Sequence, residues 1–163
     1  MMTGFAGRAK GGKLRRQPDG VSAMDDALAR AAFDEALRSH SPGFGTFFLA
    51  RLLGLEIAYG TEDCTVRMAV KDFMYNPQGS LHGGISATML DISMGHLLQH
   101  SVGVGMTLQM NTQFIKPARD GVVQARATFL RKGRSINYLE SHMTDAEGAL
   151  MAFATSTWRL LEK

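Results

Sequence analysis

Cysteine, proline and long apolar runs are all scarce in this chain of 163 residues. The single cysteine, Cys64, excludes a disulfide within the chain and any zinc site built from paired cysteines, so we expect no metal. No apolar run is long enough to cross a membrane, and the first residues lack the apolar segment of a secretion signal. We therefore expect a cytoplasmic protein with no membrane partner.

Positive charge is concentrated near the start of the chain. Residues 1–20 hold five basic residues and one acidic residue, which leaves 13 of the 18 basic and 14 of the 15 acidic residues for the rest. A body without a basic excess lacks the electrostatic footprint of nucleic-acid binding, so we expect no nucleic-acid partner. We divide the chain into a basic disordered tail, 1–21, and a single domain, 22–163.

The spacing of apolar residues predicts a helix, two strands, a second helix and four further strands. Ser22 followed by Asp25 resembles a helix cap, and apolar residues recur at helical spacing through 23–39. A dense apolar patch over 44–53 suggests a short buried helical turn. The expected strands are 55–59, 64–70, 107–115, 122–130, 136–144 and 150–160, separated by polar turn sequences.

The segment 84–100 is apolar almost all the way round a helix, with only small residues between the large ones. Such a helix must bury its whole circumference. An antiparallel sheet wrapped around it is the economical arrangement, because one helix face alone would leave the rest in water. The sequence therefore predicts an α+β fold, with a curved antiparallel β-sheet around one long central helix.

Asp91 is the one residue with a formal charge between Asp72 and Lys116. An ionised carboxylate among apolar helix residues is costly to bury unless a partner satisfies it. Serine or threonine hydroxyls could be that partner, which would make Asp91 structural. Alternatively, Asp91 faces a cleft where burial tunes its pKa for general-base catalysis.

His82, Gly83 and Gly84 directly precede this helix. Two adjacent glycines leave bare backbone N–H groups at the positive end of the helix dipole, where they can hold a phosphate or polarise a carbonyl oxygen. A flexible entry to the helix would have the same sequence. Its combination with a buried carboxylate two turns later favours a catalytic site.

The run Asn76-Pro77-x-Gly79-x-x-His82-Gly83-Gly84, followed by Asp91, resembles the signature of PaaI-type hotdog-fold acyl-CoA thioesterases, in the wider 4-hydroxybenzoyl-CoA thioesterase superfamily. The similarity extends from about Phe47 to Trp158. Three further segments are family-like: Leu53-Gly54-Leu55, Lys116-Pro117-Ala118 and Gly133-Arg134-Ser135. The resemblance implies a hotdog fold and hydrolysis of an acyl-CoA thioester to free acid and CoA.

The same resemblance implies roles for five residues. The Gly83 amide polarises the thioester carbonyl, and Asp91 activates a water or attacks directly. Asn76 and His82 position water or substrate, and Thr107 places a hydroxyl near the catalytic carboxylate. Simpler interpretations remain open, because a local hydrogen bond would explain His82 and turn formation would explain Asn76.

The segment before the fifth strand carries the residues expected to bind coenzyme A: Arg131, Lys132, Gly133, Arg134 and Ser135. Similar proteins bind CoA phosphates with basic residues at this point, and guanidinium and ammonium groups suit phosphate oxygens. A solvated hairpin tip is the alternative interpretation. Coenzyme A belongs to the substrate, so we expect no separate cofactor.

Other catalytic constellations have weaker support in the sequence. A Ser-His-Asp triad lacks the GxSxG turn, and Cys64 lies in an expected strand, where cysteine usually packs as a small apolar residue. His96 and His100 could share a helix face as metal ligands, but no acidic third ligand lies close in sequence. A noncatalytic acyl-CoA-binding hotdog module remains the alternative to the enzyme.

Gly83 and Asp91 are too far apart for one chain to supply both to a single thioester. Eight helical residues span about 12 Å at ~1.5 Å per residue. A two-fold dimer with opposed central helices would bring Gly83 of one subunit near Asp91 of the other. We therefore expect a homodimer, which the resemblance also implies, and a homotetramer as a further assembly.

Overall fold

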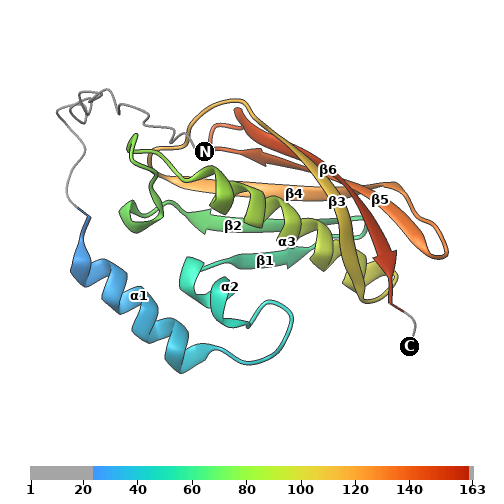
Figure 1. The fold of residues 1–163 in the computed structure, drawn as a ribbon, viewed down its shortest axis with the longest axis horizontal. Helices are drawn as coiled ribbons and strands as arrows, with labels where there is room; N and C mark the ends of the chain where they lie inside the picture. Colours follow the sequence, from blue (N-terminus) through green and yellow to red (C-terminus); the bar gives the residue numbers. More distant parts are fainter. Residues whose placement is uncertain (1–23, 162–163) are drawn as a thin grey trace, which may run out of the picture.

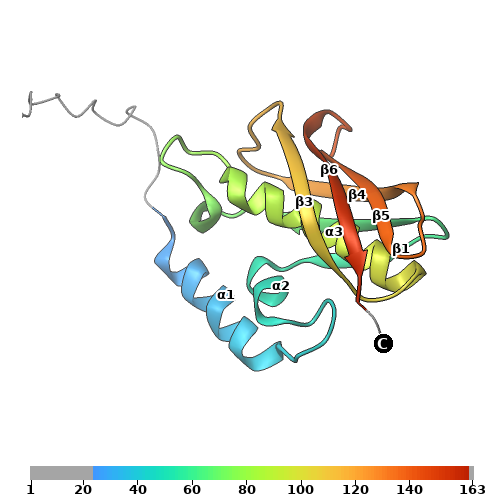
Figure 2. The same cartoon turned by 45° about the vertical axis from the view of Figure 1, so that its right-hand side comes forward.

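The computed structural model describes residues 24–161 and contains one six-stranded antiparallel sheet with the strand order β1-β2-β4-β5-β6-β3. The elements are α1 (Asp26–Ser39), α2 (Phe48–Leu53), β1 (Glu56–Tyr59), β2 (Asp63–Ala69), η1 (Asp72–Met74), α3 (Gly83–Ser101), β3 (Gly105–Phe114), β4 (Val122–Arg131), β5 (Ile136–Thr144) and β6 (Leu150–Leu160). Figure 1 and Figure 2 show the sheet curving around α3, with α1 and α2 beside this body. The predicted sheet around a long central helix is confirmed.

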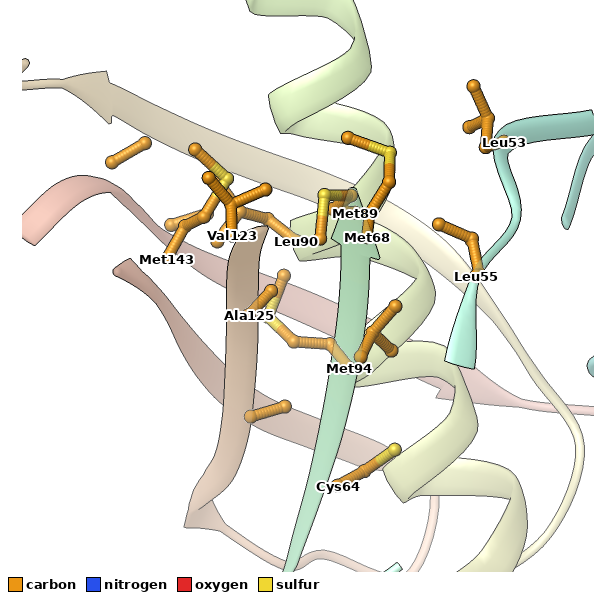
Figure 3. Packing of buried hydrophobic residues seen from close by; sticks show 14 of the residues in the cluster. Leu53, Leu55, Cys64, Met68, Met89, Leu90, Met94, Val123, Ala125 and Met143 are labelled. Carbon is orange, nitrogen blue, oxygen red and sulfur yellow. The ribbon is translucent and has the colours of Figure 1, made fainter. Parts of the chain in front are cut away.

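The core lies between α3 and the inner face of the sheet. Every second residue is buried along β5 and along β4 as far as Ala127, as expected for strands with one face against a helix. Figure 3 shows Met89 and Met94 of α3 close to Met68 and Ala125 of the strands. Methionine is flexible enough to fill the irregular space between a straight helix and a curved sheet. The core thus fixes the rotation of α3 and with it the direction of Asp91.

The first helix begins later than the sequence predicted. Asp25 is its N-cap, since the Asp25 carboxylate accepts from the backbone N–H groups of Ala27 and Leu28. The backbone N–H of Asp25 donates to Asp72 Oδ2 at 2.6 Å, which anchors the start of α1 to η1. The predicted start at 23, the proposed cap Ser22 and the predicted tail 1–21 lie outside the described residues.

The apolar patch over 44–53 forms the predicted helical turn, but it is less buried than expected. Helix α2 buries Ala50 and Leu53, whereas Phe44 and Leu49 are exposed.

None of the helices within residues 24–161 has the length and apolar character needed to cross a membrane.

Strand β3 lies at one edge of the sheet and contains a β-bulge. Thr107 is paired with Trp158 and Gln109 with Thr157, which leaves Leu108 as the extra residue. Without the bulge, Thr107 and Met110 would point to opposite faces. Because of it, both stand opposite buried partners on the face toward α3. The bulge therefore turns Thr107 toward the helix that carries Asp91.

Candidate active site

Asp91 lies half-buried on α3 and is paired with a hydroxyl from β3. Thr107 Oγ1 donates a hydrogen bond to Asp91 Oδ1 at 2.9 Å. Burial raises the pKa of the Asp91 carboxyl above its ordinary value, and the bond from Thr107 opposes this rise in part. A hydroxyl thus satisfies one oxygen of Asp91, as the structural interpretation expected, and the carboxylate also lines a cavity. The role of Asp91 as a general base stays a prediction.

A cavity of about 530 Å³ adjoins Asp91 and Thr107. Its wall is mainly apolar and includes Phe44, Phe47 and Trp158, and the residues at 42–44 close one side. Gly95 leaves room for this wall, because a Cβ there would come within 3.0 Å of the Trp158 ring. An apolar cavity with a few polar groups is the usual form of a small-molecule site.

His82 and Gly83 form the start of α3. His82 is the N-cap, since the backbone N–H of Gly84 donates to His82 Nδ1 at 2.9 Å. The hydrogen bonds found within residues 24–161 leave the Gly83 amide without an acceptor, as is usual for the first N–H of a helix. His82 therefore shapes the helix entry, and the Gly83 N–H is free to bind an oxygen atom.

Asn76 organises the loop that leads to His82. Its Oδ1 accepts from the backbone N–H groups of Gln78 and Ser80 at 3.0 and 3.3 Å, and its Nδ2 donates to Ser80 Oγ at 3.1 Å. The turn-forming interpretation of Asn76 is therefore correct. Its predicted contact with water or substrate stays a prediction.

The structure does not bring Gly83 and Asp91 together within one chain. A Cβ on Gly83 would lie 3.4 Å from the Phe114 ring at the end of β3, whereas Asp91 bonds to Thr107 near its start. Strand β3 thus runs along α3 in the opposite direction. The predicted site residues form two separate groups, one at the N-terminus of the helix and one near its middle.

The predicted CoA-binding residues lie at the last position of β4 and in the turn from β4 to β5, beyond the C-terminal end of α3 (Figure 1). Lys132 Nζ is 2.6 Å from Glu62 Oε2 and 4.8 Å from the centre of the Phe129 ring. The Gly133 N–H donates to Asn137 Oδ1 at 3.0 Å. A side chain on residue 133 would place its Cβ 2.2 Å from the Ile136 carbonyl oxygen, so the turn requires glycine. Arg131, Arg134 and Ser135 are exposed.

Sequence reasoning missed the pair formed by Tyr59 and His96. His96 lines the cavity beside Asp91, and its Nδ1 lies 2.7 Å from the Tyr59 hydroxyl. The sequence indicates His96 only as a possible metal ligand. Its partner comes from β1, 37 residues earlier, and no local pattern links the two positions.

The rival sites gain no support from the geometry. Cys64 is fully buried, and burial raises the pKa of its thiol to about 12, so it packs as an apolar side chain as predicted. No group of three His, Cys, Asp or Glu side chains is placed to hold a metal ion within residues 24–161.

Known proteins are similar to this chain in both sequence and fold. The family model described as Thioesterase superfamily matches residues 78–152. Acyl-coenzyme A thioesterase 13 of Homo sapiens is 33% identical over 97 residues, which is 57% of this chain and 69% of that protein. Thioesterase HI1161 from Haemophilus influenzae superposes with a TM-score of 0.64 at 26% identity, over 76% of this chain and 96% of that one.

A Bacillus halodurans protein, BH2602, solved with CoA, shows the same fold with a TM-score of 0.77 at 21% identity, covering 88% of this chain and 99% of that one. The resemblance inferred from the Asn76 to Asp91 motif is thereby confirmed. This chain belongs to the thioesterase superfamily, a family of thioester-hydrolysing enzymes.

Proposed function

We propose that this protein hydrolyses an acyl-CoA thioester to the free acid and CoA, with Asp91 as the central carboxylate. One observation carries the proposal: a half-buried carboxylate with a raised pKa, held by a hydroxyl, at the wall of an apolar cavity. The names of the relatives support the substrate class, as does the Bacillus halodurans protein solved with CoA.

In this mechanism Asp91 removes a proton from a water molecule, whose oxygen attacks the thioester carbon. A raised pKa makes the carboxylate a stronger base near neutral pH. The Thr107 hydroxyl occupies Oδ1, which leaves Oδ2 for the water. The carbon–sulfur bond then breaks, and the departing sulfur takes up the proton that Asp91 removed from the water, which gives CoA and restores the carboxylate. In the alternative mechanism Asp91 attacks the thioester carbon directly, CoA leaves as the thiol, and water hydrolyses the mixed anhydride to the free acid and Asp91.

The Gly83 N–H stabilises the negative charge that develops on the carbonyl oxygen. A backbone donor without another acceptor, at the positive end of a helix, suits this role. Because Gly83 and Asp91 lie about 12 Å apart along α3, the two must come from different subunits. The site is therefore complete only in a dimer.

The edge position of β3 supplies a geometry for that dimer. We count positions along β3 by the residues that pair with β6, which leaves out the bulge residue Leu108. On this count Thr107 lies three positions before Asn111, and Phe114 lies three positions after it. An antiparallel pairing of two β3 strands about Asn111 thus places Thr107 beside the partner's Phe114. Since Thr107 contacts Asp91 and Phe114 lies against Gly83, this register brings Asp91 toward the partner's Gly83.

The exposed surface of β3 supports the same pairing. Met106, Leu108 and Phe114 are each about half exposed, and a long apolar edge strand favours aggregation unless another strand covers it. A second copy of β3 would give hydrogen-bond partners to the backbone N–H and C=O groups along this edge. The homotetramer expected from the sequence remains a proposal.

Release of free thiol from a panel of acyl-CoAs tests the activity. Asp91→Asn keeps the shape of the side chain but cannot accept a proton, so kcat should fall about 10²- to 10⁴-fold. A noncatalytic acyl-CoA-binding module would bind these compounds and release no thiol. Unchanged turnover by folded Asp91→Asn would show that another group performs the chemistry.

Subunit exchange tests the shared site. Asp91→Asn and Gly83→Val homodimers should each be inactive. In Gly83→Val the added side chain should block the approach of the thioester carbonyl oxygen to the backbone N–H of residue 83. A mixed dimer holds one site with both defects and one with neither, so activity should return toward half of the wild-type value per dimer. If verified exchange restores nothing, Gly83 and Asp91 act from the same chain.

A further inference from the structure

The loop from Tyr75 to Leu81 leads directly into the start of α3. Because Gly83 is the first residue of that helix, the path of the loop sets the direction of the Gly83 N–H. Tyr75 and Leu81 form an isolated antiparallel bridge at the base of the loop. Within it, the backbone N–H of Asn76 donates to the Ser80 carbonyl oxygen at 2.8 Å. These bonds give the loop its shape, but they do not place it relative to the sheet.

Two residues of the connection between β3 and β4, Ala118 and Arg119, hold the loop from outside. The backbone N–H of Leu81 donates to the Ala118 carbonyl oxygen at 2.8 Å. The Arg119 guanidinium donates to the Gly79 carbonyl oxygen at 3.2 Å. In the other direction, the Tyr75 hydroxyl donates to the carbonyl oxygen of Arg119. One side chain from each segment therefore binds the backbone of the other.

The connection that carries Arg119 is itself fixed to the sheet. Near its start, the backbone N–H of Ile115 donates to the Met151 carbonyl oxygen of β6 at 2.8 Å. At its end, the backbone N–H of Val70, just after β2, donates to the Gly121 carbonyl oxygen at 2.9 Å. Bonds from the loop to this connection thus link the start of α3 to the sheet.

The side chain of Arg119 is exposed and is not among the residues that line the cavity beside Asp91. Water can replace an exposed hydrogen bond, so this bond adds little to the stability of the fold. A group that stabilises a transition state, in contrast, must be held within about 0.5 Å of its productive position. A contact of small energy can therefore control the reaction rate.

Building on the acyl-CoA hydrolysis and the shared site proposed above, we propose that Arg119 and Tyr75 are positioning residues for the Gly83 N–H. They act through the loop and contact neither the substrate nor Asp91. Because Gly83 of one subunit serves Asp91 of the other, Arg119 controls the reaction at the carboxylate of the partner subunit.

Loss of either contact should lower kcat and leave KM unchanged. The Gly83 N–H binds the developing oxyanion more strongly than the ground-state carbonyl, so a misplaced donor weakens binding of the transition state. Removal of such a donor lowers kcat about 10²- to 10³-fold, and displacement should lower it about tenfold. Arg119→Ala should show this loss, and Tyr75→Phe a smaller one. Arg119→Lys keeps a donor for Gly79 and should recover most of kcat.

Arg126→Ala is the matched control, because Arg126 is an exposed arginine of β4 that pairs with Asp63 Oδ2 at 2.7 Å. Its kcat and KM should equal those of the wild type. If Arg119→Ala raises KM for acyl-CoA but not for short thioesters that lack the nucleotide, Arg119 is a CoA ligand and the positioning role is wrong. A lower melting temperature with unchanged kcat would also overturn that role.

Subunit exchange shows which carboxylate Arg119 affects. In a mixed dimer of Arg119→Ala and Asp91→Asn, the remaining Asp91 belongs to the Arg119→Ala chain and uses Gly83 of the other chain, whose loop is intact. Activity should therefore rise to about half of the wild-type value per dimer. If it stays near half of the Arg119→Ala value while the Gly83→Val and Asp91→Asn pair recovers, Arg119 acts within its own subunit and the inference is wrong.

Uncleavable CoA analogues separate this inference from the proposed catalysis. A 2-oxoalkyl-CoA keeps a carbonyl near the sulfur, and the alkyl-CoA of equal length has a methylene in its place. Calorimetry should show that the wild type prefers the oxo analogue about fivefold, because the Gly83 N–H donates to its oxygen. Arg119→Ala should lose this preference, and Arg126→Ala should keep it.

The outcomes of the binding experiment are distinct. A preference that Arg119→Ala loses, without any thiol release by the wild type, would overturn the catalytic proposal and keep the role of Arg119. An unchanged preference in both Arg119→Ala and Tyr75→Phe would overturn the role of these two residues alone. Equal wild-type affinity for both analogues would overturn the role of Gly83 and, with it, this inference.

Discussion

The carboxylate of Asp91 lies in a helix with apolar neighbours. Its ionised form is the one that the proposed reaction needs, and the same form lowers the stability of the fold. Burial raises its pKa above the ordinary value of 3.8, so the folded state binds its proton more tightly than the unfolded state does. The ionised form therefore disfavours folding at neutral pH, and this cost disappears once the pH falls below the ordinary pKa. The same ionised form is the one that can act as a base.

We expect Asp91→Asn to raise the melting temperature at neutral pH and to lose this advantage as the pH falls below about 4. The wild type should gain activity as the pH rises through the raised pKa of Asp91. Thermal melts of both proteins across the acidic range provide the measurement. A variant less stable than the wild type at neutral pH would show that the Thr107 bond outweighs burial.

The hydroxyl of Thr107 also affects the pKa of Asp91. Its hydrogen bond lowers the pKa of Asp91, so Thr107→Val should raise that pKa further and move the acidic limb of the kcat/KM profile to higher pH. Thr112→Val is the control, because Thr112 stands on the same face of β3 opposite Ala154. Equal shifts in both variants would point to a general change in the strand.

At the scale of elements, the β4–β5 turn combines a backbone fixed by hydrogen bonding with exposed cationic side chains. Gly133 and Asn137 fix the turn, while Lys132 reaches Glu62 in the turn between β1 and β2. Both side chains of this ion pair are at least 40% exposed, so the pair contributes little to stability. Lys132 can therefore exchange Glu62 for a phosphate at small cost.

We expect the double variant Lys132→Ala and Arg134→Ala to raise KM for acyl-CoA without changing hydrolysis of short thioesters that lack the nucleotide. A contact remote from the carbonyl stabilises ground and transition state alike, so kcat should stay near the wild-type value. Glu62→Gln frees Lys132 and should leave KM unchanged or lower it. Equal losses on both substrate types would mean that the turn has only a structural role.

At the scale of the whole molecule, the register of two paired β3 strands decides whether the site is complete. Pairing about Asn111 places residue 111 opposite its own copy. A cysteine at that position should form an intermolecular disulfide on oxidation, because directly opposed residues have Cβ atoms about 4.5–5.5 Å apart. Cys64 is buried and should not interfere.

Asn111→Cys should therefore migrate as a covalent dimer on a non-reducing gel. Gln113→Cys is the matched control, since residue 113 would lie about 13 Å along the strand from its own copy, too far for a disulfide. Efficient crosslinking of Gln113→Cys in place of Asn111→Cys would move the axis and separate Asp91 from the partner's Gly83.

The sequence by itself determined the order of the elements, the buried central helix and the family motif from Asn76 to Asp91. Period-two and period-3.6 patterns reflect which residues of one segment meet the core, so each is visible locally. Asp91 can be recognised from the sequence because its charge is unusual among apolar helix residues. Gly83 and Gly84 can be recognised because they are adjacent and directly precede that helix.

Only the tertiary structure decided which distant residues meet at the site. The bulge at Leu108, the edge position of β3 and the cavity depend on pairing with β6, whose partner residues lie 38 to 55 positions away in the sequence. Tyr59 and His96 meet across 37 positions. Such contacts arise from the packing of elements against one another, which the periodicity of a single segment does not encode.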